Sequence, residues 1–237
     1  MSRFFSKLAL SLAALVILGL TGSNAYADGI VFAGENHDKL VPPLSVLNLQ
    51  GHPSEAGGVS WNGHGDVEFG DTIRGQNHNN TFTLAQFGIT NANQLVINLN
   101  INEPQPAGGP FDPLTLNSLV LTGYDQNGNV AYTASLLGGP LDLTQFQMAK
   151  GSTADFAFGL DAAAAARLNA ALAANPNLRL GLSSSLTNTQ AGPESFGIAK
   201  GVGPTAVPEP ASMVLLGTGL LGAATAARKR RQANKKE

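Results

Sequence analysis

The stretch from Trp61 to Asn80 holds the densest group of side chains in the chain that are suited to chemistry. Asp66 and Glu68 stand two residues apart, so on a strand their carboxylates share one face, and Asp71 follows closely. Carboxylate oxygens favour calcium, whereas the two histidines of the group favour a transition metal. An ordinary solvated loop is the third interpretation and the most common one. The group consists of Trp61, His64, Asp66, Glu68, Asp71, Arg74 and His78.

Trp61 is the only tryptophan of the chain. Its ring could stack on a sugar, and it could equally belong to the core. The sequence thus leaves open a lectin-like module that binds a glycan or calcium through Trp61 and the carboxylates at 66, 68 and 71. A pair of carboxylates could also hydrolyse glycosides, but sequence does not give the spacing which that reaction needs. A secreted hydrolase is therefore the less favoured alternative.

Two further patterns match known motifs only in part. The glycines at 217, 219 and 222 have the spacing of a dinucleotide fingerprint, but they lie in an apolar run near the chain end, with no strand before them. Residues 125–129 begin like a calcium loop, but Leu136 stands where the loop requires a glutamate. We therefore expect no catalytic residues, no enzyme activity and no cofactor, although a calcium ion is left open.

The elements that position these residues are mainly strands. Residues 94–102 alternate, with Leu95, Ile97, Leu99 and Ile101 on one side and asparagines on the other, which predicts one dry face and one wet face. Residues 114–124 and 130–137 flank an Asn-Gly pair, which indicates a β-hairpin because both residues accept positive φ. Weaker strands are predicted at 67–69, 81–84, 141–148, 155–160, 178–186 and 196–199. The pattern favours a mainly β fold, an antiparallel β-sandwich of jelly-roll type.

One helix is predicted among the strands. Asp161 is a good N-cap, residues 162–174 are rich in alanine, and Asn175-Pro176 ends the run. Leu168 and Leu172 stand four residues apart and give the helix a narrow apolar stripe. We expect it to pack across one end of the sandwich.

The N-terminal segment has the features of a secretory signal peptide. Arg3 and Lys7 precede an apolar run from Leu8 to Leu20, and Ala25-Tyr26-Ala27 has the small residues of a cleavage site. The run is shorter than the ~20 residues that a membrane helix needs. Residues 1–27 are thus predicted to be removed by signal peptidase, which leaves an exported chain that starts near Asp28.

The C-terminal segment has three parts in a fixed order. Val207-Pro208-Glu209-Pro210 is extended because each proline restricts its own backbone and that of its predecessor. Residues 211–227 are apolar or small, long enough for a transmembrane helix. A basic tail, residues 228–237, begins with Arg228, Lys229, Arg230 and Arg231 and stays in the cytoplasm.

This layout resembles the PEP-CTERM sorting signal of bacteria that make exopolysaccharide. The resemblance covers residues 204–237 and implies that an exosortase in the inner membrane processes the chain near Pro208. The same type of tail also bears the name of an ice-binding protein C-terminal segment, and that name describes the tail rather than an activity. Residues 28–203 resemble an uncharacterised β domain associated with PEP-CTERM proteins, which implies no activity.

The part of the chain between the two terminal segments is more acidic than the chain as a whole. Residues 28–206 contain 6 of the 14 basic and 14 of the 16 acidic residues, a net charge of 6 − 14 = −8 against −2 for the whole chain. This charge argues against nucleic acid as a partner. Cysteine is absent, so the chain has no disulfides. We expect a secreted β domain, residues 28–203, with a structural or adhesive role at the cell surface or in the exopolysaccharide matrix, anchored in the inner membrane only before processing.

Overall fold

The computed structural model describes residues 29–35, 44–73, 79–101, 114–143, 154–189 and 192–201. All of them belong to one compact unit, Ala27–Ala206. The predicted signal peptide, the membrane helix at 211–227 and the basic tail lie outside the described residues. Among the described residues, no helix has the length and apolar character that a membrane crossing requires.

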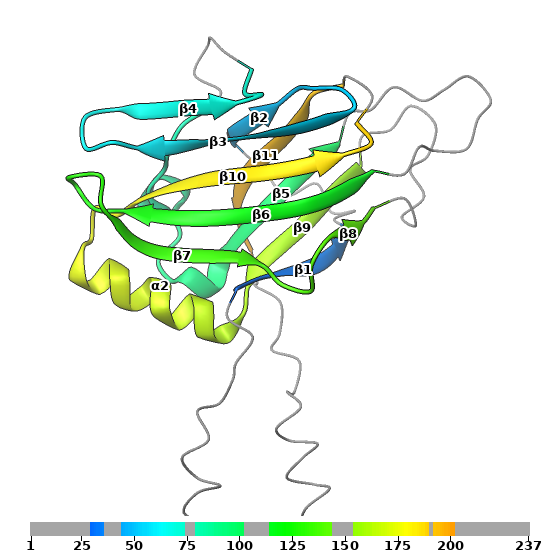
Figure 1. The fold of residues 1–237 in the computed structure, drawn as a ribbon. Helices are drawn as coiled ribbons and strands as arrows, with labels where there is room; N and C mark the ends of the chain where they lie inside the picture. Colours follow the sequence, from blue (N-terminus) through cyan, green and yellow to red (C-terminus); the bar gives the residue numbers. More distant parts are fainter. Residues whose placement is uncertain are drawn as a thin grey trace, which may run out of the picture. The chain divides into compact units, whose positions relative to one another are not determined.

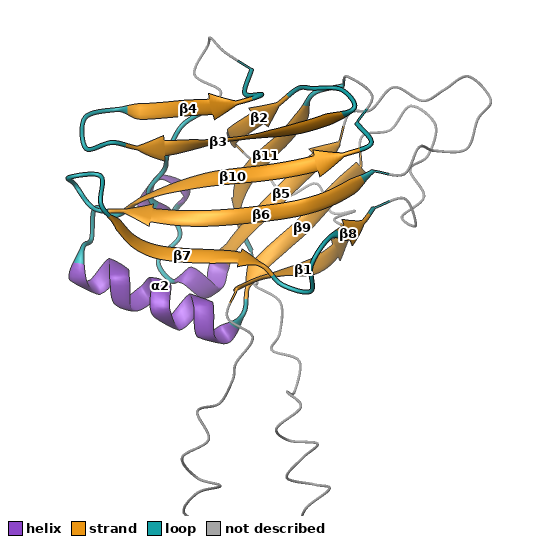
Figure 2. Cartoon of the chain, in the orientation of Figure 1, coloured by secondary structure: helices purple, strands orange, loops and turns teal. Residues whose placement is uncertain are grey.

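Strands dominate the described part of the chain (Figure 2). The strands are β1 (Gly29–Glu35), β2 (Leu44–Leu49), β3 (Ser54–Trp61), β4 (Asp66–Gly70), β5 (Leu95–Ile101), β6 (Thr115–Tyr124), β7 (Val130–Leu136), β8 (Leu141–Asp142), β9 (Ala154–Leu160), β10 (Arg179–Thr187) and β11 (Glu194–Lys200). Two 3-10 turns, η1 (Leu84–Phe87) and η2 (Ala92–Gln94), and one α-helix, α2 (Ala162–Ala174), complete them. The expected mainly β fold with one alanine-rich helix is confirmed.

The strands form one curled sheet rather than the two sheets of a sandwich. Their order is β2-β11-β5-β9-β1-β7-β6-β10-β3-β4, with β8 paired to β6. β4, β3, β10, β6 and β7 lie in front in Figure 1, and β2, β11, β5 and β9 lie behind them. Two halves therefore face each other as in a sandwich, but they are continuous, because β1 bonds to β9 on one side and to β7 on the other.

The two edges of the sheet meet through the chain that follows β4. Gln50 N–H donates to Asp71 O at 3.0 Å, and Ile73 N–H donates to Asn48 O at 3.1 Å. Asn80 N–H adds a bond to Val46 O at 3.0 Å. We call this contact of residues 71–73 and 79–80 with β2 the seam. It links the edges of the sheet that β2 and β4 form, without a full strand ladder.

The core lies between the two halves, and α2 covers one end of it (Figure 1). Ala164, Ala165 and Leu168 of the helix are fully buried, and the Tyr132 hydroxyl of β7 donates to Ala164 O at 3.2 Å. The Asp161 carboxylate accepts Ala164 N–H at 2.7 Å, so the predicted N-cap and the bounds of the helix are confirmed.

The prediction of a wet face on β5 is wrong. The strand is where the alternation placed it, but Asn98 on its polar face is only 4% exposed. Residues 95–99 of the strand, which pairs with β11 and β9, are all buried, so this part of the strand has no solvated face. Alternation therefore identified the strand, but polarity did not predict exposure.

The other strand predictions have mixed outcomes. The β6–β7 hairpin is confirmed, although in its turn only Gly128 has positive φ, at 85°. Thr81–Leu84 is wrong as a strand, because a single bridge at Phe82 is followed by η1, which Thr83 caps. Of 141–148 only Leu141–Asp142 is a strand among the described residues. The runs at 67–69, 155–160, 178–186 and 196–199 correspond to β4, β9, β10 and β11.

Candidate functional site

The predicted group lies on the β3–β4 hairpin and the chain after it. Trp61 ends β3 and faces Asp66 at the start of β4 in the strand register, with His64 in the turn between them. Glu68 follows on the same face of β4 as Asp66, as predicted. Asp71 comes directly after β4. Arg74 and His78 lie outside the described residues.

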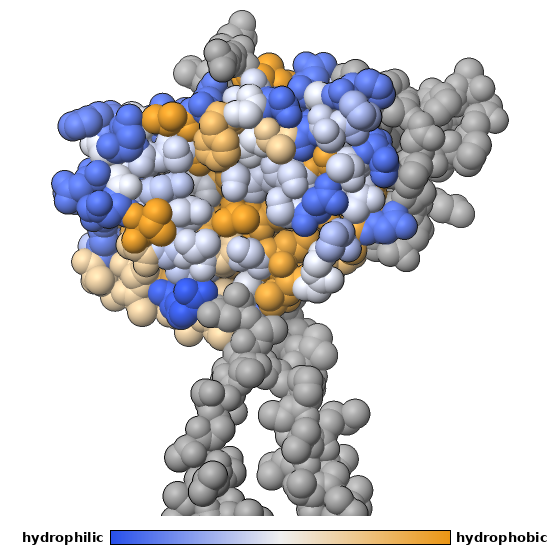
Figure 3. Space-filling view, in the orientation of Figure 1, coloured by the Kyte–Doolittle hydropathy of each residue, from blue (hydrophilic) through white to orange (hydrophobic). Residues whose placement is uncertain are grey.

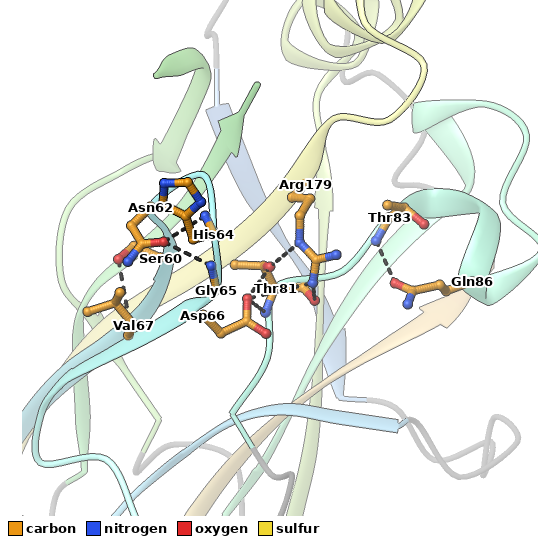
Figure 4. Close-up of polar contacts among 10 residues, drawn as sticks. All are labelled: Ser60, Asn62, His64, Gly65, Asp66, Val67, Thr81, Thr83, Gln86 and Arg179. Carbon is orange, nitrogen blue, oxygen red and sulfur yellow. Dashed lines mark hydrogen bonds and ion pairs between the residues drawn. The ribbon is translucent and has the colours of Figure 1, made fainter. Parts of the chain in front are cut away.

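Asp66 belongs to a network that joins β4, the segment at Thr81 and β10 (Figure 4). Its Oδ1 accepts hydrogen bonds from the Thr81 N–H, at 3.1 Å, and from the Thr81 hydroxyl. Arg179 of β10 donates from Nε to Thr81 Oγ1 at 2.7 Å and from its terminal nitrogen to Thr81 O at 3.0 Å. The same nitrogen lies 3.6 Å from Asp66 Oδ1. Thr81 is therefore held between a carboxylate and a guanidinium.

Trp61 is covered by the same arginine. The Arg179 guanidinium lies over the indole ring, 4.3 Å from its centroid, in a cation–π contact. The ring is half-buried, and its Nε1 is enclosed without a hydrogen-bond partner among the described residues. One face of the ring is thus already in use by the protein itself, which argues for a packing role of Trp61.

Glu68 is directed to a different partner from Asp66. Glu68 Oε1 accepts a hydrogen bond from Asn79 Nδ2 at 3.2 Å. Asn79 also donates to Ile73 O at 2.9 Å and accepts the Asn48 N–H on Oδ1 at 2.7 Å. Asn79 is 4% exposed and connects β2, β4 and the chain after β4. It is the central side chain of the seam.

The remaining two members of the group are separate from these networks. Asp71 Oδ2 accepts the Ala56 N–H at 2.8 Å and so fixes the end of β4 against β3. His64 donates its backbone N–H to Asn62 Oδ1 at 2.9 Å, and its side chain is exposed. The hairpin brings Trp61, Asp66 and Glu68 together, while Asp71 and His64 point to other partners.

The described residues contain no group of three or more His, Asp or Glu side chains placed to hold a metal ion. In the turn at 125–129, the Asp125 carboxylate accepts the backbone N–H groups of Asn127 and Asn129, both at 2.8 Å, and the Asn129 side-chain amide at 3.0 Å. These bonds, led by the one from the Asn129 side chain, hold the pKa of Asp125 below its usual value. These hydrogen bonds account for the position of the Asp125 carboxylate in the turn.

Sequence reasoning missed the residues that organise this region. Thr81 and Arg179 are 98 positions apart, and no local signal connects them. Asn79 was one polar residue among many in an Asn-rich stretch.

The comparisons with known proteins bear on the tail. A family model of the PEP-CTERM protein-sorting motif matches residues 206–231. This range contains Val207, Pro208, Glu209 and Pro210 as well as Arg228, Lys229, Arg230 and Arg231. The chain is therefore an exported protein with a PEP-CTERM motif, targeted to exosortase and held by a C-terminal membrane anchor before processing.

The comparisons with curated proteins and with solved structures gave no match. The resemblance of residues 28–203 to an uncharacterised PEP-CTERM-associated domain stays a prediction.

Proposed function

We propose that residues 28–203 form a non-catalytic structural or adhesive component of the cell surface or the exopolysaccharide matrix. The observation that carries this proposal is the use of the polar side chains in the candidate site. Asp66, Glu68 and Asp71 each accept hydrogen bonds from neighbouring strands and segments, so they hold the curled sheet together. A catalytic or metal site instead directs such groups to one point.

The sorting motif supplies the second argument. A PEP-CTERM protein is exported and then handed to exosortase at the membrane, so its folded part works outside the cytoplasm. The acidic domain, with its net charge of 6 − 14 = −8, remains soluble there and avoids anionic polymers unless cations screen them. Neutral glycans fit this surface best.

Processing and destination are tested together with an epitope tag placed in the secreted part. We expect the wild-type protein to lose its tail near Pro208 and to co-purify with extracellular polysaccharide. A variant with Pro208→Ala, Glu209→Ala and Pro210→Ala should stay in the inner membrane, whereas Glu237→Ala should behave as the wild type. Mass spectrometry of the mature C-terminus is the measurement. An extracellular pool that still ends at Glu237 would contradict exosortase processing.

The structural role is tested by the cohesion of the matrix. A strain that lacks the protein should form a matrix which disperses more readily under shear, and the wild-type gene should restore it. Restoration by the membrane-retained triple variant would contradict a role in the matrix. Steady breakdown of purified polysaccharide by the protein would contradict a non-catalytic role.

Glycan binding is the second candidate, and the partial exposure of Trp61 beside the exposed residues Asn62 and His64 favours it. A glycan array with and without calcium tests it directly, and Trp61→Ala should abolish any signal that uses the indole ring. Absence of binding in both conditions rejects this candidate and leaves the structural role intact.

A further inference from the structure

Asn-Gly occurs at two hairpin tips, as Asn62-Gly63 between β3 and β4 and as Asn127-Gly128 between β6 and β7. The tips touch, because a Cβ on Gly128 would lie 2.6 Å from the carbonyl carbon of Asn62. In an Asn-Gly pair the glycine nitrogen can attack the side-chain amide carbon, since no Cβ hinders its approach. The dipeptides are identical, so a difference in their reactivity must come from the structure.

Of the two asparagines, Asn62 has the side-chain amide that is better prepared for attack by the glycine nitrogen. Its Oδ1 accepts backbone N–H groups from His64 and Gly65, both at 2.9 Å (Figure 4). These donors draw electrons from the amide carbon and stabilise the negative charge that Oδ1 gains during attack, as an oxyanion hole does. The N–H of Gly63 has no hydrogen-bond acceptor among the described residues, so no bond competes with its deprotonation. Asn62 is exposed, and water reaches it.

Asn127 has the opposite arrangement. The Gly128 N–H donates to Asp125 O at 3.1 Å, so the attacking nitrogen is engaged in the turn. The Asn127 backbone N–H donates to the Asp125 carboxylate, and its side-chain amide accepts no bond among the described residues. Neither the nitrogen nor the amide carbon is prepared for reaction.

We propose that Asn62 is a site of spontaneous deamidation through Gly63, with water as the only co-reactant, and that it reacts faster than Asn127. The Gly63 nitrogen gives its proton to water and forms a bond to Cγ of Asn62. The bond from Cγ to Nδ2 breaks, and Nδ2 takes up a proton and leaves as ammonia. Water then opens the resulting succinimide ring. Hydrolysis at Cγ yields aspartate at position 62, and hydrolysis at the backbone carbonyl yields isoaspartate.

The isoaspartate product changes the turn. Its main chain runs through the former side chain, so the oxygen that accepted the N–H groups of His64 and Gly65 is no longer in place. The turn loses both bonds, and its contact with Gly128 shifts. An exported protein that persists outside the cell therefore acquires a modified hairpin tip as it ages.

The test is a time course on the isolated mature protein at neutral pH. Peptide mapping by mass spectrometry follows residues 62 and 127, and chromatography separates the aspartate and isoaspartate peptides. In the folded protein Asn62 should convert at least about fivefold faster than Asn127. One hydrogen bond that stabilises the transition state by about 1 kcal/mol raises a rate by about this factor. In concentrated urea the two sites should convert at similar rates, because the structural difference is gone.

Two variants separate the causes. Asn62→Gln should stop the reaction at position 62 and leave Asn127 unchanged. His64→Ala keeps the backbone N–H but removes the imidazole, so the rate at Asn62 should not change. A rate at Asn62 equal to or below that at Asn127 in the folded protein overturns the proposal. So does a fivefold preference that persists in urea, or a fivefold loss in His64→Ala, which would make the imidazole the base.

Discussion

Replacing Asn79 by alanine measures how strongly the seam between β2 and the chain after β4 holds. The side-chain amide is 4% exposed and makes three hydrogen bonds, to Asn48 N–H at 2.7 Å, Ile73 O at 2.9 Å and Glu68 Oε1 at 3.2 Å. A buried N–H left without an acceptor costs about 1–3 kcal/mol, and a second lost bond about 1 kcal/mol. We therefore expect Asn79→Ala to lower the free energy of unfolding by about 3 kcal/mol.

The assay is urea unfolding of the mature protein, followed by the fluorescence of Trp61, the single tryptophan. The midpoint should fall while the dependence of the free energy on urea stays constant, because the surface exposed on unfolding hardly changes. Asn93→Ala is the matched control, since Asn93 is exposed, and it should change stability by less than about 0.5 kcal/mol. If the two variants lose equal stability, the seam is not held by Asn79 and the reasoning is refuted.

Three further predictions use the same unfolding assay or a titration. Arg179→Ala should lower the free energy of unfolding by about 2 kcal/mol, because it removes two hydrogen bonds to Thr81 and the cation–π contact with Trp61. Arg179→Lys should recover less than half of this loss, because lysine cannot make both hydrogen bonds. Full recovery by lysine would show that the paired hydrogen bonds to Thr81 are not what stabilises the protein. Asp161→Ala should cost about 1–2 kcal/mol through loss of the helix cap, and Asp161→Asn should cost less because its oxygen can still accept Ala164 N–H. The Asp125 carboxyl should titrate in carbon NMR below its ordinary pKa of 3.8, so its stabilising effect is present above that pH and is lost as the pH falls through the lowered pKa. Asn129→Ala should raise the pKa of Asp125, and an unchanged titration would exclude the Asn129 side chain as the cause.

Local signals in the sequence predicted the local elements. Asp161, the alanine run and Asn175-Pro176 determine the bounds of α2 within a single segment, and the Asn-Gly pair marks the β6–β7 hairpin. β3 was missed because Gly57 and Gly58 weaken the strand pattern. Those glycines are required by packing, since a Cβ at Gly57 would lie 2.6 Å from Phe69 O.

Non-local contacts were beyond prediction from one sequence. The alternation in β5 does not reveal that both faces of residues 95–99 are buried, so its asparagines were assigned to solvent. The sequence grouped the carboxylates at 66, 68 and 71 but did not give their hydrogen-bond partners, Thr81, Asn79 and Ala56, which lie 15, 11 and 15 positions away. Burial and pairing across the sheet, rather than residue type, decide that they tie strands together.

The order of the strands also sets a condition on when the protein can fold. β2 pairs with β11, and a bond from the Ser195 hydroxyl to Asn48 Oδ1 joins residues 147 positions apart. β1, the first strand, pairs with β9 and β7 near the middle of the sheet. Such distant pairings slow folding, because the long loops must close first. The sheet cannot be completed before residues 194–200 are available to pair with β2 and β5, and the sorting motif at 206–231 follows shortly after them in the chain. The domain can therefore complete its fold only when nearly all of the chain before the sorting motif has been made.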